Sequence, residues 1–287
     1  MRQEQNPAAV PWQSVAIRLA AVLAAVLAWL AAPAPAAADV DALPAAGAGP
    51  VAEVPDGDTI VLADGRVVRL AGVLAPEPAP ERRRGRAGER EPDGDPGRLA
   101  AAARERLAAL VAGRRVELRA GGRTVDRHGR LLAHLVRAED GLWVQGALLA
   151  DGLVRVYTFA DVRALAADMY ALEAAARQAR RGLWAERRFA VLTPETVHDR
   201  LYGFRIVEGV VHEVAEVRRR VYLNFGADWR TDFTVSIAPG DRERFAEAGL
   251  DLTALQGRRV RVRGWVRSYN GPLIDADHPE QIEVLPP

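Results

Sequence analysis

Short runs that alternate apolar and polar residues, separated by glycine-containing turns, recur along this chain and favour a mainly β fold. The clearest pair lies in DGDTIVLADGRVVRLAGVLAPE (56–77), where Thr59–Leu62 and Arg66–Leu70 flank the turn sequence ADG. Successive side chains of a strand point to opposite faces, so each run offers one apolar face to a core. The pattern predicts a hairpin of two half-buried strands.

Helices are predicted to follow. In RLAAAARERLAALVAG (98–113), leucines and alanines recur at helical spacing, and Gly113 is placed to end the helix. ALLADG (147–152) predicts a short helix that closes at Gly152. Asp161 is placed to cap a longer helix that ends at Gly182, with Leu165, Met169, Leu172 and Ala176 as its apolar stripe. RRVELRA (114–120) and RLLAHLVRA (130–138) predict further strands.

The second half of the chain repeats this order. Arg205–Val214, Arg219–Phe225 and Asp232–Ile237 are predicted strands, residues 240–257 are helical, and strands return from residue 258. Three strands, a helix and two or more strands is the order of an OB-type barrel. The fold class we predict is therefore mainly β with α, in two tandem OB-type five-stranded barrels.

The N-terminus is typical of an export signal. Arg2 and Arg18 precede a short apolar run, LAAVLAAVLAWLAA, which is followed by an Ala-x-Ala end, so residues 1–38 are predicted to be a signal peptide. The protein is then exported, periplasmic or secreted, or membrane-anchored if the signal is not cleaved. Residues 39–50 are rich in Ala, Gly and Pro and are predicted to be a linker.

The charged residues restrict the partners. The formal net charge is only +1, so binding of a polyanion requires a local cluster of cations. The sequence contains no lysine, which excludes a P-loop, and all 39 basic residues are arginines, whose planar groups suit phosphate or carboxylate. Cysteine is absent, so disulfides are excluded and the redox compartment stays open.

Four motifs occur together in order: DGDTI (56–60), RLAGVLAPE (69–77), DRHGR (126–130) and RRGLW (180–184). In this combination the chain resembles the staphylococcal nuclease (thermonuclease-like) family from about Val51 to Glu186. The resemblance implies a thermonuclease-like domain at 51–188, a nuclease-like barrel with packed helices. A linker at 189–203 and an OB-type domain at 204–287 are predicted to follow.

The resemblance also implies calcium-dependent hydrolysis of DNA or RNA phosphodiesters. Asp58 and the backbone carbonyl of Ala75 would bind the metal, Arg69 and Arg130 would hold the phosphate, and Glu77 would act on the attacking water. These are suitable groups, because calcium prefers oxygen ligands and arginine donates two parallel hydrogen bonds to phosphate oxygens.

Further nucleic-acid contacts are predicted at Arg127, Tyr157 and Phe159. Family positions similar to the two aromatic residues stack on a base, although packing in the core or at its rim is an equal alternative. His128, in the same loop as Arg127, contacts phosphate or is simply solvated. The five histidines show no spacing that would predict a zinc site.

One residue departs from the family pattern. The family's second metal-binding aspartate stands three residues before the glutamate, where this chain has Leu74. The site then binds calcium weakly, binds another divalent cation, or binds no metal. Three hypotheses stay open: an exported nuclease, a nuclease-fold module that binds nucleic acid without cutting it, and an envelope protein whose barrels only dock partners.

Two arginine-containing regions lie outside these motifs. The Arg82–Arg90 cluster is predicted to lie in a surface loop beside the site, as a solvated face or a nucleic-acid contact. The second barrel interleaves arginines with aromatic residues, which suits a single-strand platform but also an ordinary core or a protein-docking surface. These aromatic residues are Tyr222, Phe225, Trp229, Phe233, Trp265 and Tyr269.

Overall fold

The computed structural model describes residues 39–77 and 96–286. Residues 38–287 group into one compact unit. The predicted signal peptide and the Arg82–Arg90 cluster lie outside the described residues. Within the described residues, every helix is too short or too polar to cross a membrane.

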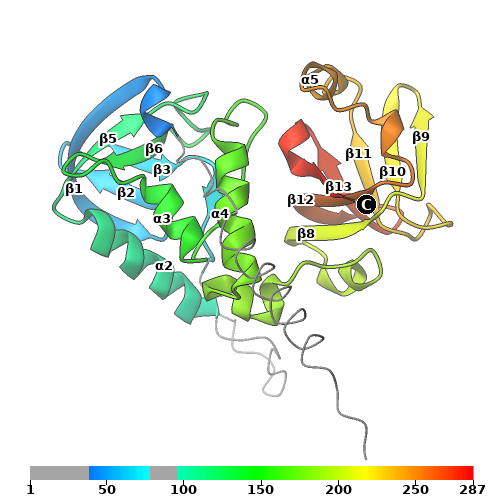
Figure 1. Ribbon diagram of the computed structural model, residues 1–287, viewed down its shortest axis with the longest axis horizontal. Coiled ribbons are helices and arrows are strands. Elements are labelled where there is room, and N and C mark those ends of the chain that lie inside the picture. Colours follow the sequence, from blue (N-terminus) through cyan, green and yellow to red (C-terminus); the bar gives the residue numbers. More distant parts are fainter. Residues whose placement is uncertain (1–38, 78–95, 287) are drawn as a thin grey trace, which may run out of the picture. The chain divides into compact units, whose positions relative to one another are not determined.

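Five strands close the first barrel (Figure 1). The order is β1-β2-β3-β6-β5, in which β3 and β6 run parallel and the other neighbours run antiparallel. The strands are β1 (Ala45–Asp56), β2 (Thr59–Leu62), β3 (Val67–Leu70), β5 (Arg115–Arg119) and β6 (Leu131–Arg137). The predicted hairpin is therefore confirmed as β2 and β3. A separate pair is formed by β4 (Val73–Leu74) and β7 (Arg155–Val156).

The prediction of a linker at 39–50 is wrong, because Ala45–Pro50 is the first half of β1. These residues pair with β5. Their strand conformation comes from the backbone hydrogen bonds of this pairing, because their small side chains do not favour a strand by themselves. The small residues also make room for Arg66. Its guanidinium donates to the carbonyl of Ala48, and a Cβ at Gly47 would stand 3.0 Å from its Nη1 atom.

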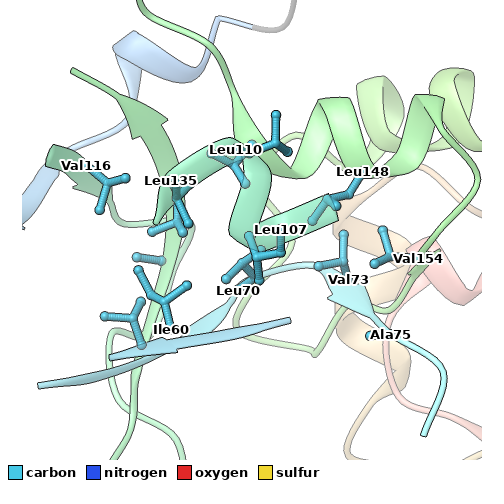
Figure 2. Close-up of a cluster of buried hydrophobic side chains, with 14 of the residues drawn as sticks. Ile60, Leu70, Val73, Ala75, Leu107, Leu110, Val116, Leu135, Leu148 and Val154 are labelled. Carbon is cyan, nitrogen blue, oxygen red and sulfur yellow. The ribbon is translucent and has the colours of Figure 1, made fainter. Parts of the chain in front are cut away.

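Three helices accompany the first barrel: α2 (Pro96–Val111), α3 (Val144–Ala150) and α4 (Ala166–Gln178). Leu107 and Leu110 of α2 and Leu148 of α3 join Ile60 and Leu135 in one buried cluster (Figure 2). The predicted helices at 98–112 and 147–152 are confirmed, because their periodic leucines are the residues that fill this core.

The third helix differs from its prediction in two ways. It begins at Ala166 with Leu165 as its N-cap, and Asp161 instead pairs with Arg123, at 3.2 Å. Its buried face also includes Glu173, whose carboxylate accepts the backbone N–H of Val156 at 2.8 Å. A polar residue on the inner face of the helix interrupts the apolar period.

The second sheet repeats the strand order of the first barrel. The path β9-β10-β11-β13-β12-β8 contains one parallel pair, β11 with β13, at the place that β3 and β6 occupy in the first barrel. The two ends of this path, β8 and β9, follow each other in the chain. The strands are β8 (Gly203–Val210), β9 (Glu213–Val217), β10 (Arg220–Asn224), β11 (Thr234–Ile237), β12 (Arg259–Ser268), β13 (Pro272–Ala276) and β14 (Ile282–Val284).

One helix, α5 (Arg242–Glu247), stands between β11 and β12, as α2 stands between β3 and β5. It is shorter than the predicted helical segment 240–257, whose later part holds a single 3-10 turn at Thr253–Leu255. The predicted strand 205–214 is divided between β8 and β9. Other 3-10 turns lie at Val40–Ala42, Gly182–Ala185, Arg187–Phe189, Thr196–Arg200 and Pro279–Gln281.

A buried ion pair joins α4 to the second sheet. Arg263 of β12 contacts both carboxylate oxygens of Glu173, at 3.2 and 3.0 Å, and each residue is only 1% exposed. The carboxylate of Glu283 also contacts Arg263. Each of these two buried charges is compensated by the other, and removal of either residue would leave an unpaired charge in the interior. The segment 189–203 is also packed, since Val197 is buried with Val207 in the second core.

Candidate functional site

A cavity of about 580 Å³ lies on the first barrel, and all eight residues predicted as site residues line it. They come from the β1–β2 turn, β3, the segment after β4, the loop before β6 and the segment after β7. The lining residues that were predicted are Asp58, Arg69, Ala75, Glu77, Arg127, Arg130, Tyr157 and Phe159. The motifs that are far apart in the sequence therefore form one site.

Asp58 and Arg69 bind each other within this cavity. One carboxylate oxygen of Asp58, Oδ2, lies 2.9 Å from Nη2 of Arg69 and accepts the backbone N–H of Ala75 at 2.6 Å. Arg69 further donates from Nη1 to the carbonyls of Asp58 and Leu70, and from Nη2 to that of Val73. These four contacts use both terminal nitrogens of the guanidinium.

The surroundings of Asp58 disfavour its charge. The residue is only 7% exposed. Burial raises the pKa of its carboxyl to about 6, although the charge of Arg69 and the N–H of Ala75 act in the opposite direction. Asp58 is therefore held by partners inside the fold rather than open to solvent.

Gly57 allows this arrangement. A Cβ at Gly57 would stand 2.6 Å from the Cβ of Ala103 on α2 and 2.8 Å from the Cβ of Ala75. Only glycine lets the β1–β2 turn approach α2 so closely, and this approach sets the position of Asp58 against Ala75.

Leu74, at the position of the missing aspartate, contacts an apolar cluster. Its half-buried side chain packs against the cluster of Ala176, Trp184, Phe204 and Ile206. It lines the cavity as well. The wall beside Asp58 is thus hydrophobic where the family pattern has a second carboxylate.

The donor set here does not suit a calcium ion. Calcium takes six to eight oxygen ligands, several of them carboxylates. Among the described residues, no group of three or more acidic or histidine side chains is close enough to hold a metal. Of the two predicted ligands, Asp58 is already paired with Arg69, which leaves the carbonyl of Ala75.

The 123–130 loop forms another part of the cavity lining and is organised by Asp126. Its Oδ1 atom accepts the backbone N–H groups of His128 and Arg130, at 2.8 and 2.9 Å, and its Oδ2 accepts Nε of Arg130 at 2.8 Å. Partial burial disfavours the charge of Asp126, but these hydrogen bonds, led by the Arg130 amide, keep its pKa below the usual range.

Two arginines of this loop keep donors available. Within the described residues, the Nη groups of Arg130 have no partner, because its contacts to Asp126 use only Nε and the backbone. Arg127 is exposed and uses Nε for the ring of His128, at 3.1 Å. The cavity lining holds four arginines and four acids, so any attraction for phosphate comes from individual donors rather than from net charge.

Tyr157 and Phe159 form an aromatic part of the wall. Their ring centroids lie 4.7 Å apart in an edge-to-face arrangement. The ring of Tyr157 also lies 5.2 Å from that of Phe204, and its hydroxyl accepts Nε1–H of Trp265 at 3.2 Å. Both rings line the cavity, and both pack against neighbours. The two predicted alternatives, a surface for a base and packing at the rim of the core, therefore apply to the same two residues.

Glu77 is exposed and lines the cavity. The sequence analysis missed Arg123 and Asp56, which also line it. Arg123 carries no motif of its own and is recognisable only by its place three residues before Asp126. Asp56 belongs to the DGD motif, and its carboxylate accepts the backbone N–H of Asp58 at 2.9 Å.

Comparison with known families agrees with this geometry. Residues 67–186 match the model of the family described as staphylococcal nuclease homologue. A search of curated proteins gives no match. The match begins at β3 and ends just after Trp184, so it contains every predicted site residue except Asp58. Residues 67–186 of this chain therefore form a staphylococcal nuclease-like domain.

Proposed function

We propose that this protein binds single-stranded nucleic acid through the cavity of its nuclease-like domain and does not hydrolyse it with a metal ion. The observation that carries the proposal is the pairing of Asp58 with Arg69 beside the hydrophobic side chain of Leu74. The groups that would hold a metal and the transferring phosphate are engaged with each other.

The absence of one carboxylate is large enough to matter. A charge-assisted contact is worth roughly 1.5–3 kcal/mol, so Leu74 in place of aspartate weakens metal binding by roughly 10- to 100-fold. Asp58 would in addition have to exchange Arg69 for the metal. Arg127 and Arg130 face no such competition, and their open Nη groups suit phosphate oxygens.

The test is a binding assay run beside a cleavage assay. Labelled single-stranded DNA and RNA are incubated with the protein in calcium, magnesium, manganese or chelator. We expect binding that weakens with salt and no product in any lane. Arg127→Gln should lower the salt slope by about 0.7, the value for one phosphate contact on a single strand. Arg104→Gln, an exposed arginine on α2, is the matched control and should leave the slope unchanged.

A second candidate is metal-assisted hydrolysis with Glu77 acting on water, favoured because Glu77, Arg130 and Asp58 line the same cavity. Product that requires calcium and disappears in Glu77→Gln would establish this candidate. Failure to bind either nucleic acid would overturn both and would leave a docking role. Export by residues 1–38 is part of the proposal, and N-terminal sequencing of the mature protein tests it.

A further inference from the structure

The outer face of the second sheet carries a groove that is separate from the nuclease-like cavity. Two hollows, of about 410 and 500 Å³, share Tyr222, Tyr269 and Leu273 in their linings. The two hollows adjoin at these residues, and together we call them the sheet groove. Tyr222 has small neighbours across the sheet, since it pairs with Ser236 on one side and with Ala215 on the other.

Aromatic side chains form the walls of the sheet groove. Trp229 is 48% exposed and Tyr269 is 59% exposed, whereas Phe225 and Phe233 of the same region are buried in the core. The two predicted alternatives, a platform and a core, therefore apply to different residues: Trp229 and Tyr269 are exposed, and Phe225 and Phe233 belong to the core. An arginine lies over one face of each of two rings, with Arg230 Cζ 4.6 Å from the Trp229 centroid and Arg267 Cζ 5.4 Å from that of Tyr269.

The two loops that carry these rings are fixed against each other. A Cβ at Gly271 would stand 2.2 Å from the carbonyl oxygen of Thr231, so only glycine permits the contact. Asp232 Oδ2 accepts the backbone N–H of Asp228 at 2.8 Å and orders the Trp229 loop. The walls are therefore in place before a ligand arrives, which lowers the entropy that binding loses.

The turn between β9 and β10 gives the strongest indication of a charged ligand. It consists of Arg218 and Arg219, both left-handed, with φ of 51° and 66°. A two-residue hairpin of this kind favours Asn-Gly, and arginine is strained in it. Both side chains are exposed, and within the described residues neither guanidinium has a partner. Residues in strained backbone with unused charge suggest a function.

The charges of the groove leave these two arginines uncompensated. Asp275 is bound by Arg267 at 2.8 Å, Asp241 by Arg244, and Asp277 by His278. Glu213 lies at the other end of the ladder, four residues along β9 from the turn, or roughly 13 Å away. Val217 and Arg220, which flank the turn, line the two hollows, so the turn stands at the edge of the groove and its two guanidinium groups are available to an anion there.

We infer that the sheet groove binds a segment of single-stranded nucleic acid, with bases stacked on Tyr222, Trp229 and Tyr269 and phosphates held by Arg218 and Arg219. Exposed aromatic rings can stack on planar groups, and arginines without a partner attract anions. A single strand supplies both at regular spacing. This site is independent of the nuclease-like cavity.

The decisive variant is the double substitution Arg218→Asn with Arg219→Gly, tested in the full protein with labelled oligothymidylate. Asn-Gly suits the left-handed turn, so the melting temperature should stay level or rise. The affinity should nevertheless fall about tenfold, and the salt slope should fall by about 1.4, the value for two phosphate contacts. A purely structural turn would show the gain in stability without the loss of affinity.

Two controls and a second probe complete the test. Arg104→Gln with Arg115→Gln removes two exposed arginines from the first barrel and should leave the affinity unchanged. Tyr222→Ala or Tyr269→Ala should weaken binding by roughly tenfold each, whereas Tyr202→Ala, which removes a 77%-exposed tyrosine outside the groove lining, should not. A sugar–phosphate chain without bases should lose the part of the affinity that these tyrosines supply.

Unchanged affinity in the Asn-Gly variant, or an equal loss in the first-barrel control, would overturn the inference. The result is separate from that of the proposed function. Loss of binding in the Asn-Gly variant with none in Arg127→Gln would support the sheet groove and contradict the cavity, and the reverse result would do the opposite.

Discussion

Leu74→Asp tests whether one side chain prevents this site from binding a metal. The substitution restores the second carboxylate of the family pattern next to Asp58. Without metal, the change removes about half the burial of a leucine side chain, worth about 1–1.5 kcal/mol. It also places a charge beside the buried carboxylate of Asp58, at a cost of about 1 kcal/mol more. The free energy of unfolding should fall by about 2–3 kcal/mol.

Calcium should recover part of this loss in the variant. If the rebuilt site binds calcium at about 1 mM, 10 mM calcium stabilises the folded state by about 1.4 kcal/mol. For a folded unit of this size the melting temperature should rise by about 3–6 °C. Thermal unfolding with and without calcium, followed by circular dichroism, measures both effects.

Leu74→Asn is the matched control, because it has the shape of aspartate without the charge. We expect it to lose a similar amount of packing and to show no shift with calcium. The original protein should also show none. An equal shift in the original protein, or no shift in Leu74→Asp, would refute the reasoning that Leu74 is what blocks the metal. Calcium-dependent cleavage gained by Leu74→Asp and lost on adding Glu77→Gln would extend the result to catalysis.

Two further predictions concern buried polar groups. Burial lowers the pKa of His134 to about 4, so below its ordinary value of 6.5 the unfolded state takes up the proton first. Stability should be fully present above pH 6.5 and fall by about 3 kcal/mol by pH 4, and urea unfolding of His134→Gln should lack this part of the pH dependence. Glu173→Gln should destabilise by about 3–5 kcal/mol by leaving Arg263 underpaired, whereas Glu173→Leu with Arg263→Met should recover most of it in the same assay.

The sequence was sufficient for the parts of the fold that a local period determines. Leucines at helical spacing placed α2, and the alternation around Gly65 placed β2 and β3. The first half of β1 was misread as a linker, because Ala and Gly carry no strand preference and the order comes from pairing with β5. The secondary structure of that segment is determined by tertiary contact and not by intrinsic propensity.

The same distinction between local sequence pattern and tertiary contact applies to the site. The ordered motifs were sufficient to predict eight residues that line one cavity. They could not show that Asp58 and Arg69 pair, because the motifs do not give the register of the β2–β3 hairpin, which places Arg69 opposite Thr59. Glu173 was missed on its helix, because its partner Arg263 lies 90 residues later in the chain.

The buried pair of Glu173 and Arg263 decides how this protein can be divided. Each half of the chain, expressed alone, would keep one full charge on a surface shaped to exclude water. A half that aggregates or loses affinity would then reflect an orphaned charge and not the location of a binding site. Point variants in the intact chain, or halves that carry Glu173→Leu and Arg263→Met, are the appropriate way to assign a function to either part. The same pair predicts that heat unfolds the first barrel and the second sheet together, in a single calorimetric transition.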